Sequence, residues 1–236
     1  MAAADTHSMD PASALGELAR ILLSEGSLES VLAMVAGLAM RTVPGAEEVS
    51  LTLVRNDRGV TAASTGKLGL LADEFQYNLD GGPCLDASRG NEVVVIDDMS
   101  TEGRWPDYCP LAFDVGASSS LSVPLPVQEQ VLGALNIYST VPRAFDARSV
   151  EVGTTFAAHA AIAVANADLY ASTAERAEQL QAAMSSRAVI EQAKGVLMGQ
   201  RRCTPSEAFD LLIVASQREN VKLRIVAERI VAGVAK

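Results

Sequence analysis

Three basic residues near the C-terminal end are spaced so that they could contact a polyanion together. Arg187, Lys194 and Arg201 recur every seven positions, so they form one stripe if the segment is helical. Further cations lie close to the turns expected between helices: Arg202, Lys222 and Arg224. Such a stripe either binds phosphates or is a solvated helix face, and the spacing alone leaves both interpretations open.

The formal charge is divided unevenly along the chain. The 236 residues carry a net charge of −10, which taken alone argues against a nucleic-acid partner. From Tyr170 to Lys236, however, ten Lys or Arg oppose seven Asp or Glu, which gives +3 and leaves −13 for the residues before Tyr170. The acidic excess therefore belongs to the N-terminal part, and the C-terminal part can contact phosphates.

The cysteines are the second set of candidate functional residues. Cys84 follows Gly81-Gly82-Pro83 at the expected start of a helix, where the helix dipole can lower the pKa of a thiol. Cys109 lies in an expected loop further along. The two are interpreted as a redox pair, a chromophore attachment point or catalytic groups, or else as buried cysteines without a reactive role.

Other catalytic or metal chemistry is not indicated, and neither is a cofactor. His7 lies in an expected disordered tail and His159 in an alanine-rich helix, so they form no metal or nucleophile constellation. Three cysteines are too few and too scattered for a disulfide framework. Because neither a signal peptide nor an apolar membrane span is visible, we expect a cytoplasmic protein that does not contact a membrane. Because no acid–base pair accompanies the cysteines, the protein is not expected to be an enzyme.

The N-terminal part alternates between helical and strand-like segments. Helices are expected at 11–23, 28–43 and 68–77, with a short one after Pro83, and strands at 49–54, 60–64, 93–96, 118–127 and 131–138. Asn56-Asp57-Arg58-Gly59 and Gln128-Glu129-Gln130 are expected hairpin turns. Strands joined by hairpins and bracketed by helices predict an antiparallel sheet with helices on one face.

A proline-free segment connects this part to the C-terminal part. Five residues recur there every seven positions and form a seam of the coiled-coil type: Phe156, Ala163, Tyr170, Ala177 and Met184. A continuous helix over 147–202 would be roughly 84 Å long, too long to bury this seam within one domain. A parallel homodimer is therefore predicted. The alternative is a helix that breaks after about Ala171 and packs on its own sheet.

Three short helices are expected at the C-terminal end. Thr204-Pro205-Ser206-Glu207 is a capping box with proline at the first helical position, so it begins the second helix. Asn220 is expected to end that helix in the left-handed conformation. The expected buried positions are Ile190, Ala193 and Leu197, then Ala208, Leu211, Leu212 and Ala215, then Leu223, Val226, Ala227 and Ile230. The three amphipathic helices would pack as a compact bundle.

Four motifs give the N-terminal part a resemblance to GAF sensor domains. They are Asp80-Gly81-Gly82-Pro83-Cys84, Arg104-Trp105-Pro106, Ser122-Val123-Pro124-Leu125 and the run from Leu132 to Tyr138. The resemblance implies a pocket for a small molecule without identifying it. It also implies that Trp105 and Tyr108 line this pocket, or else pack as a lid over the sheet. Free-methionine-sulfoxide reductases have this fold and use cysteines in this region, but their Ser-Glu-Ile is replaced by Ser120-Leu121-Ser122. A cysteine-dependent reductase is one alternative function.

The run 186–198, with Ala193-Lys194-Gly195, resembles the ANTAR domain, an RNA-binding module of bacterial regulators of transcription termination. The resemblance implies RNA contacts by Arg187, Lys194 and Gly195. Polar residues and further cations are expected to contribute to binding: Gln192, Arg201, Arg202, Asn220 and Lys222. After the pair Leu211-Leu212 the family usually has arginine, whereas this chain has Ile213 and Val214. The departure would weaken RNA binding or form a dimer contact.

The sequence thus predicts a tail (1–13), a GAF domain (14–169), a coiled-coil linker helix (156–184) and an ANTAR domain (175–236). A signal sensed by the GAF domain would control a homodimer that binds hairpin loops of nascent RNA and prevents a terminator from forming. The second alternative is a dimeric ligand-binding interaction module that does not bind RNA.

Overall fold

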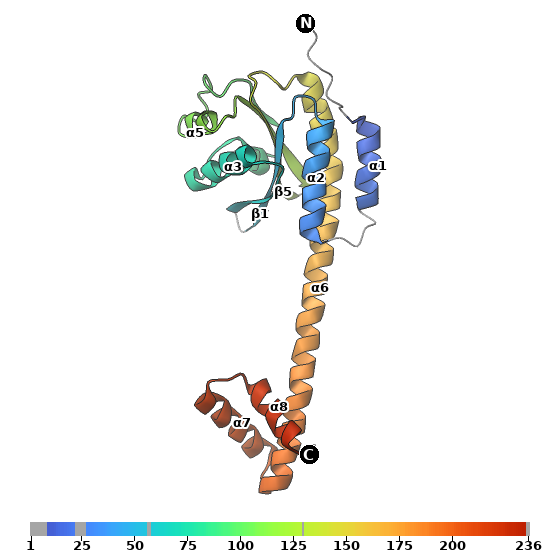
Figure 1. Cartoon of the computed structure of the whole chain (residues 1–236), viewed down its shortest axis with the longest axis vertical. Coiled ribbons are helices and arrows are strands. Elements are labelled where there is room, and N and C mark those ends of the chain that lie inside the picture. Colours follow the sequence, from blue (N-terminus) through green and yellow to red (C-terminus); the bar gives the residue numbers. More distant parts are fainter. Residues whose placement is uncertain (1–8, 22–26, 56–57, 129, 235–236) are drawn as a thin grey trace. The chain divides into compact units, whose positions relative to one another are not determined.

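The computed structural model describes residues 9–21, 27–55, 58–128 and 130–234. It divides into two compact units, with unit 1 ending at Ala171 and unit 2 beginning at Ser172, and the long helix α6 (Ala147–Arg201) contributes to both (Figure 1). Within the described ranges, no helix is apolar over a stretch long enough to cross a membrane. Helix α1 (Pro11–Ile21) begins at Pro11, as predicted, while residues 1–8, including His7, lie outside the described residues.

Five antiparallel strands form one sheet in unit 1, as predicted. Their order in the sheet is β2-β1-β5-β4-β3. The strands are β1 (Glu48–Arg55), β2 (Arg58–Ser64), β3 (Val94–Ile96), β4 (Ser119–Val127) and β5 (Gln130–Ser139). The pairs β1–β2 and β4–β5 are the predicted hairpins, and β1 pairs with β5 across the centre of the sheet.

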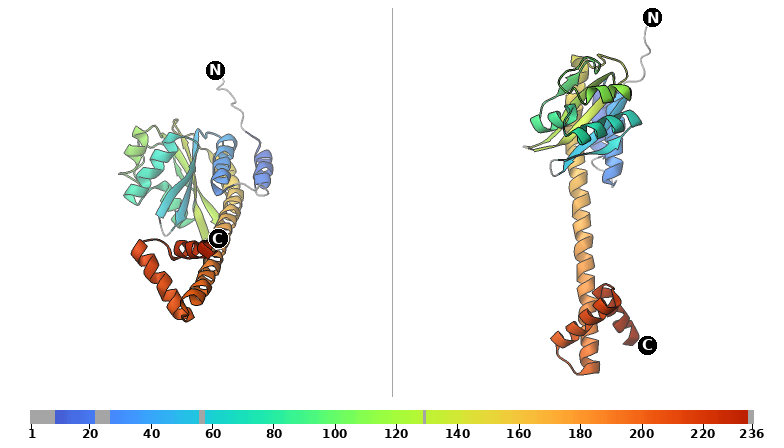
Figure 2. Two further views of the ribbon diagram at one scale, coloured as in Figure 1. Left: turned by 60° about the horizontal axis from the view of Figure 1, so that its bottom comes forward. Right: turned by 90° about the vertical axis from the view of Figure 1, so that its left-hand side faces the viewer.

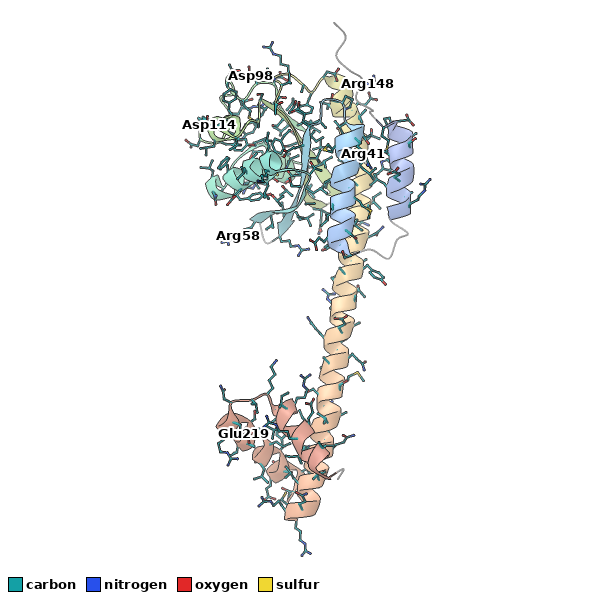
Figure 3. The ribbon with its side chains drawn as sticks, viewed as in Figure 1. Arg41, Arg58, Asp98, Asp114, Arg148 and Glu219 are labelled. Atoms are coloured by element: carbon teal, nitrogen blue, oxygen red, sulfur yellow. The ribbon has the colours of Figure 1, made fainter. Side chains whose placement is uncertain are left out.

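Helices cover both faces of this sheet, so the prediction of helices on one face is wrong. One face carries α2 (Leu28–Thr42) and the first part of α6, with α1 outside them (Figures 1 and 2). The other face carries α3 (Lys67–Leu79), α4 (Pro83–Gly90) and α5 (Cys109–Asp114). Arg41 of α2, labelled in Figure 3, forms a partly exposed ion pair with Glu17 of α1 at 3.7 Å.

Alternation along the strands gives the two faces of the sheet different chemistry. The face toward α2 and α6 is aliphatic, with Leu51, Val123 and Leu135 fully buried in one core cluster. On the opposite face, toward α3, α4 and α5, the side chains are mainly polar: Ser50, Thr52, Ser120, Ser122, Asn136 and Tyr138. Both sets of side chains are buried, because helices cover both faces of the sheet.

The predicted seam on α6 divides between the two units. Phe156 and Ala163 are each only 2% exposed, and Phe156 packs in the core against the sheet. This corrects their assignment as dimer contacts, because their own domain already covers them. Tyr170 and Met184 are 70% and 68% exposed. The helix therefore packs on its own sheet, as the alternative predicted, but it does not break after Ala171.

Unit 2 is the predicted bundle of α6, α7 (Pro205–Glu219) and α8 (Leu223–Val234). Its core contains Ala193, Leu212, Val226 and Ala227. The predicted capping box is present, since the Thr204 hydroxyl accepts from the Glu207 N–H at 3.3 Å and the Glu207 carboxylate accepts from the Thr204 N–H at 2.8 Å. Asn220 ends α7 with a φ of 52°, as expected. Leu211, expected in the core, is 44% exposed.

Candidate functional sites

A polar cluster is buried in unit 1 between the sheet and helices α3 and α4. At its centre is Asp73, whose Oδ1 accepts from Tyr138 Oη at 2.7 Å and from Asn136 Nδ2 at 3.1 Å. Its Oδ2 accepts from Thr61 Oγ1 at 2.8 Å. Burial raises the pKa of Asp73 although these hydrogen bonds oppose the shift. Burial therefore makes this carboxyl group, which α3 places against the sheet, easier to protonate than an exposed one.

Cys84 belongs to the same cluster and lies in the first turn of α4, where it was predicted. Its N–H donates to Gln76 Oε1 at 2.7 Å, and its thiol lies 3.2 Å from both Thr52 Oγ1 and Asn136 Nδ2. Burial, reinforced by Asp73, raises the pKa of the Cys84 thiol to about 12. The expectation that the helix dipole lowers this pKa is therefore wrong, because the loss of solvent outweighs the dipole.

The other predicted pocket residues lie at two different depths. Tyr108 is buried in a cluster with Tyr138, beside the polar cluster, and Cys109 is buried at the start of α5. Burial and Glu102 raise the pKa of the Cys109 thiol to about 11. Trp105 is half-buried, and its Nε1 donates to Asp86 Oδ2 at 2.9 Å. Tyr108 thus lines the interior, while Trp105 covers it from the outside.

Several buried polar atoms around this cluster have no hydrogen-bond partner among the described residues. They include Gln76 Nε2, Ser120 Oγ, Ser122 Oγ and Asn136 Oδ1. Ser122 and Asn136 are paired across β4 and β5, so these atoms face the same side of the sheet. Buried polar groups are rarely left unpaired in folded proteins. A bound water or a small polar molecule would satisfy these atoms.

This buried polar face was not predicted from the sequence, although the alternation of residues along the strands indicates it. Ser50 and Thr52 alternate with aliphatic residues on β1, as do Ser120 and Ser122 on β4. Period-two polar residues in a strand usually indicate exposure to water. Here α3 and α4 cover them, which requires contacts between residues far apart in the chain.

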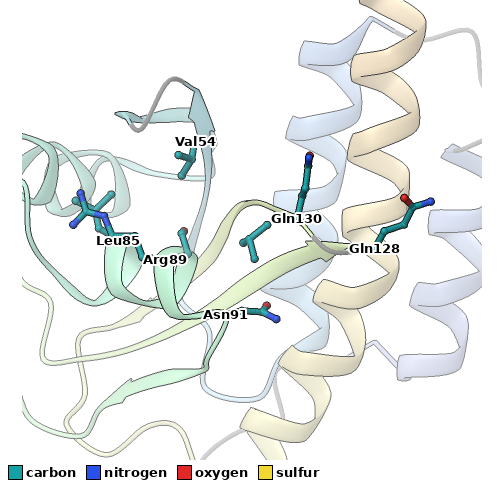
Figure 4. Close-up of a pocket in the computed structure, with 8 residues that line it drawn as sticks. Val54, Leu85, Arg89, Asn91, Gln128 and Gln130 are labelled. Atoms are coloured by element: carbon teal, nitrogen blue, oxygen red, sulfur yellow. The ribbon is translucent and has the colours of Figure 1, made fainter.

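A separate cavity of about 420 Å³ lies between α4 and the β4–β5 hairpin (Figure 4). Its polar lining comes from Arg89, Asn91, Gln128 and Gln130. Arg89 is already engaged, since its guanidinium forms an ion pair with Asp80 at 2.6 Å. The cavity is a second, more open place where unit 1 could hold a polar molecule.

The end of strand β1 is tied to α6 by an ion pair. Arg55 Nη2 lies 2.6 Å from Asp168 Oδ1, and both side chains are partly exposed. Thr52, three residues earlier on the same strand, accepts from the Cys84 thiol. One strand therefore contacts both the polar cluster and the part of α6 just before Ala171.

In unit 2 the predicted cations differ in their exposure to solvent and in their ion pairs. Four of them are exposed and make no ion pair within the described part of the chain: Arg187, Arg201, Arg202 and Lys222. Lys194 is different, because its side chain is only 17% exposed and its Nζ lies 2.9 Å from Glu191 Oε1. The same Nζ lies over the ring of Phe209, 5.9 Å from its centre. The middle of the stripe is therefore held within the bundle.

The remaining predicted contact residues lie on the surface of unit 2. Gln192, Gly195 and Asn220 are exposed. A Cβ built on Gly195 would meet nothing within 4 Å, so packing inside the chain does not require glycine there. Glycine within a helix costs about 1 kcal/mol relative to alanine, and the missing side chain leaves room at Gly195 for a partner to approach the backbone. Val214 is 60% exposed, so this departure from the family does not fill the core.

Comparisons with known proteins match the two units separately. The model of the GAF domain matches residues 25–165, and the model of the ANTAR domain matches residues 178–231. Among solved structures, free methionine-R-sulfoxide reductase from Neisseria meningitidis, in complex with its substrate, is 20% identical with a TM-score of 0.55. That alignment covers 72% of this chain and 96% of that chain.

A GAF domain from a phosphoenolpyruvate-protein phosphotransferase of Coxiella burnetii is also 20% identical, with a TM-score of 0.53. The alignment covers 71% of this chain and 99% of that chain. At this level of identity, these similarities establish the fold of unit 1 alone. No curated protein matches the chain.

Proposed function

The chain belongs to the GAF domain family and carries an ANTAR domain after its GAF domain, and we propose that it is a signal-responsive RNA-binding regulator of transcription termination. The GAF domain senses a signal, and the ANTAR module binds hairpin loops of nascent RNA so that a terminator does not form. The observation that carries this proposal is the coincidence of the ANTAR match with the exposed, unpaired cations of unit 2.

The RNA contacts are assigned by exposure and charge. Arg187 and Arg201 lie on one side of α6 and bind phosphates, and Arg202 and Lys222 extend the positive surface to the helix ends. Two polar side chains and the open glycine complete the surface: Gln192, Asn220 and Gly195. Hairpin loops suit this surface because their bases are unstacked and their backbone is accessible.

The exposed apolar side chains of α6 support a homodimer. Tyr170, Leu180 and Met184 are each at least 67% exposed, and Ala177 lies in the same seven-residue repeat as Tyr170 and Met184. A helix leaves such residues in water only at a cost of about 25 cal/mol per Å² of apolar surface. A parallel second copy of α6 covers them, and the dimer then presents two ANTAR modules to two hairpins.

The signal is a small polar molecule bound by the cluster around Asp73. The unpaired polar atoms of Gln76, Ser122 and Asn136 support this assignment. The GAF domain acts by binding without turnover, since the Cys84 thiol is fully buried and its raised pKa leaves little thiolate at neutral pH. Movement of β1 would reach α6 through the Arg55–Asp168 ion pair.

Titration of the full chain with a two-hairpin RNA at about 50 mM and about 200 mM salt tests the proposal. Binding should weaken steeply with salt, by about 0.7 to 0.9 in logarithmic slope for each phosphate contact. The double variant Arg187→Ala/Arg201→Ala should flatten this slope. Arg148→Ala removes an exposed arginine from unit 1 (Figure 3) and should leave it unchanged. Absence of binding even at about 50 mM salt would favour the interaction module that does not bind RNA.

A further inference from the structure

Phe209 is the one aromatic residue between Ser172 and Lys236, and the residue is 37% exposed. We propose that this ring is the platform on which an unstacked loop base stacks when unit 2 binds RNA, so that Phe209 contributes both affinity and selectivity for a base at one loop position. The proposal rests on the proposed RNA-binding function and assigns a role within that site.

The position of Phe209 on α7 separates it from the core of the bundle. Its neighbours Ala208 and Leu212 are fully buried, whereas Phe209 lies one residue round the helix from Ala208 and is not part of the core cluster. A helix surface position of this kind needs no aromatic side chain for stability. An aromatic residue with over a third of its surface exposed therefore remains available to a ligand with a flat π-face.

The ring lies beside the cationic stripe of α6. Lys194 Nζ is placed over it, 5.9 Å from the ring centre, and Arg187 and Arg201 lie two helical turns from Lys194 in either direction. A nucleotide whose phosphate is bound by one of these arginines is thus brought close to the ring. Base stacking on aromatic side chains is a principal means by which proteins recognise single-stranded RNA, and it accompanies contacts to the backbone.

The local structure holds the ring in place before RNA arrives. The capping box of Thr204 and Glu207, with Pro205 at the first helical position, fixes the start of α7 one turn before Phe209. Lys194 is itself held by Glu191 through contacts of 2.9 and 3.0 Å. Lys194 therefore lies against the ring, 5.9 Å from its centre, and a side chain that is already in contact loses less conformational freedom on stacking.

The test compares Phe209→Leu with Phe209→Tyr in the full chain, using a two-hairpin RNA and the same RNA with single abasic sites along each loop. Phe209→Leu should weaken binding about 5- to 150-fold, the range expected for loss of one stacked base. The salt slope should not change, because the phosphate contacts remain. Phe209→Tyr keeps the ring and should bind like the parent. At one loop position the abasic RNA should weaken the parent protein but not Phe209→Leu any further.

A second measurement does not depend on truncating the side chain. In a Trp105→Phe background, Phe209→Trp places the only tryptophan of the chain on α7. Its emission should be quenched by the two-hairpin RNA, and less so by RNA with the abasic site at the sensitive position. Equal affinity of Phe209→Leu and the parent, strictly additive losses at every loop position, or unquenched emission in the RNA complex would each overturn the inference. If the parent protein bound no RNA, the proposed function would fall, and this inference with it.

Discussion

The ammonium group of Lys194 lies 2.9 Å from one carboxylate oxygen of Glu191 and 3.0 Å from the other. The central cation of the stripe is therefore neutralised on its own helix, one turn from its partner. Lys194 also packs over Phe209 and is mostly shielded from solvent, whereas Arg187 and Arg201 are exposed. The two arginines, rather than Lys194, are expected to supply most of the phosphate affinity.

Glu191→Gln should strengthen RNA binding. The substitution removes the negative charge that competes with phosphates for Lys194, so the salt slope should steepen by up to about 0.7 to 0.9 units. Lys194→Ala should flatten it less than Arg187→Ala does. Titrations at several salt concentrations measure both effects. Glu178→Gln makes the same change of charge on α6 at an exposed position outside the ion pair and is the matched control. Equal slopes for the parent and Glu191→Gln would show that Lys194 does not reach the RNA.

Thr204→Ala should lower the stability of unit 2 by about 1 kcal/mol, because the hydroxyl that caps α7 is lost. Hydrogen bonds from Thr204 lower the pKa of Glu207, so the contribution of this carboxylate is complete above its ordinary pKa of 4.5 and is lost as the pH falls through the lowered value. Unfolding in denaturant at pH 7 and below pH 4 measures both effects. Ser206→Ala, within the same turn but outside the cap, is the control. Loss of RNA binding with an unchanged thermal midpoint would contradict a structural role for Thr204.

Asp73→Asn should change how the stability of unit 1 depends on pH. Burial raises the pKa of Asp73 above its ordinary value of 3.8, so the folded state binds this proton more tightly than the unfolded chain does. The free energy of unfolding should therefore fall as the pH rises from about 4 through the raised pKa, and Asp73→Asn should remove that part of the decline. Denaturant titrations across this range decide the question, with the exposed Asp107→Asn as the control. Identical pH profiles for the parent and Asp73→Asn would contradict a raised pKa for this buried carboxyl group.

Features that depend on residues close together in the chain could be predicted from the sequence, whereas contacts between distant residues could not. The capping box at Thr204 and the left-handed Asn220 depend on residues only a few positions away, and both were predicted correctly. The environment of Cys84 was not, because its contacts Thr52 and Asn136 come from strands 32 and 52 residues away. At that distance the sequence shows the local helix dipole but not the burial that overrides it.

Periodicity alone also leaves the partner of a helix face undetermined. Phe156 and Tyr170 belong to the same seven-residue repeat, yet Phe156 packs on the sheet and Tyr170 is exposed. A repeat shows that a helix face is apolar without showing what packs against it. The Lys194–Glu191 pair was different, since a spacing of three on a helix is a local signal that could have been used.

The three thiols should react at very different rates. Cys84 and Cys109 are buried, with pKa values raised to about 12 and about 11, so their reactive thiolates are scarce at neutral pH. Cys203 is partly exposed and should react first with a disulfide reagent in the native protein. Cys203→Ser should remove the fast phase, and denaturation should expose the other two thiols.

Incubation with free methionine sulfoxide and a thiol reductant should give no product. Reduction that depends on Cys84 would support the reductase instead.

Ala177→Glu should dissociate a dimer formed through the exposed seam of α6. Light scattering at micromolar concentration should give twice the 24.7 kDa chain mass for the parent and the single mass for the variant. Unit 1 should remain folded, because Ala177 is exposed and lies beyond Ala171. Ala158→Glu, at an exposed position of α6 outside the seam, should leave the dimer intact.

Ala163→Glu gives a different outcome, although Ala163 belongs to the same repeat. This side chain is only 2% exposed, so the substitution places a carboxylate inside unit 1 and should unfold that unit. Thermal unfolding distinguishes the two variants, since Ala163→Glu should lower the midpoint of unit 1 and Ala177→Glu should not. A parent chain that is monomeric at micromolar concentration, or an Ala177→Glu variant that stays dimeric, would show that this seam is not the contact between two copies.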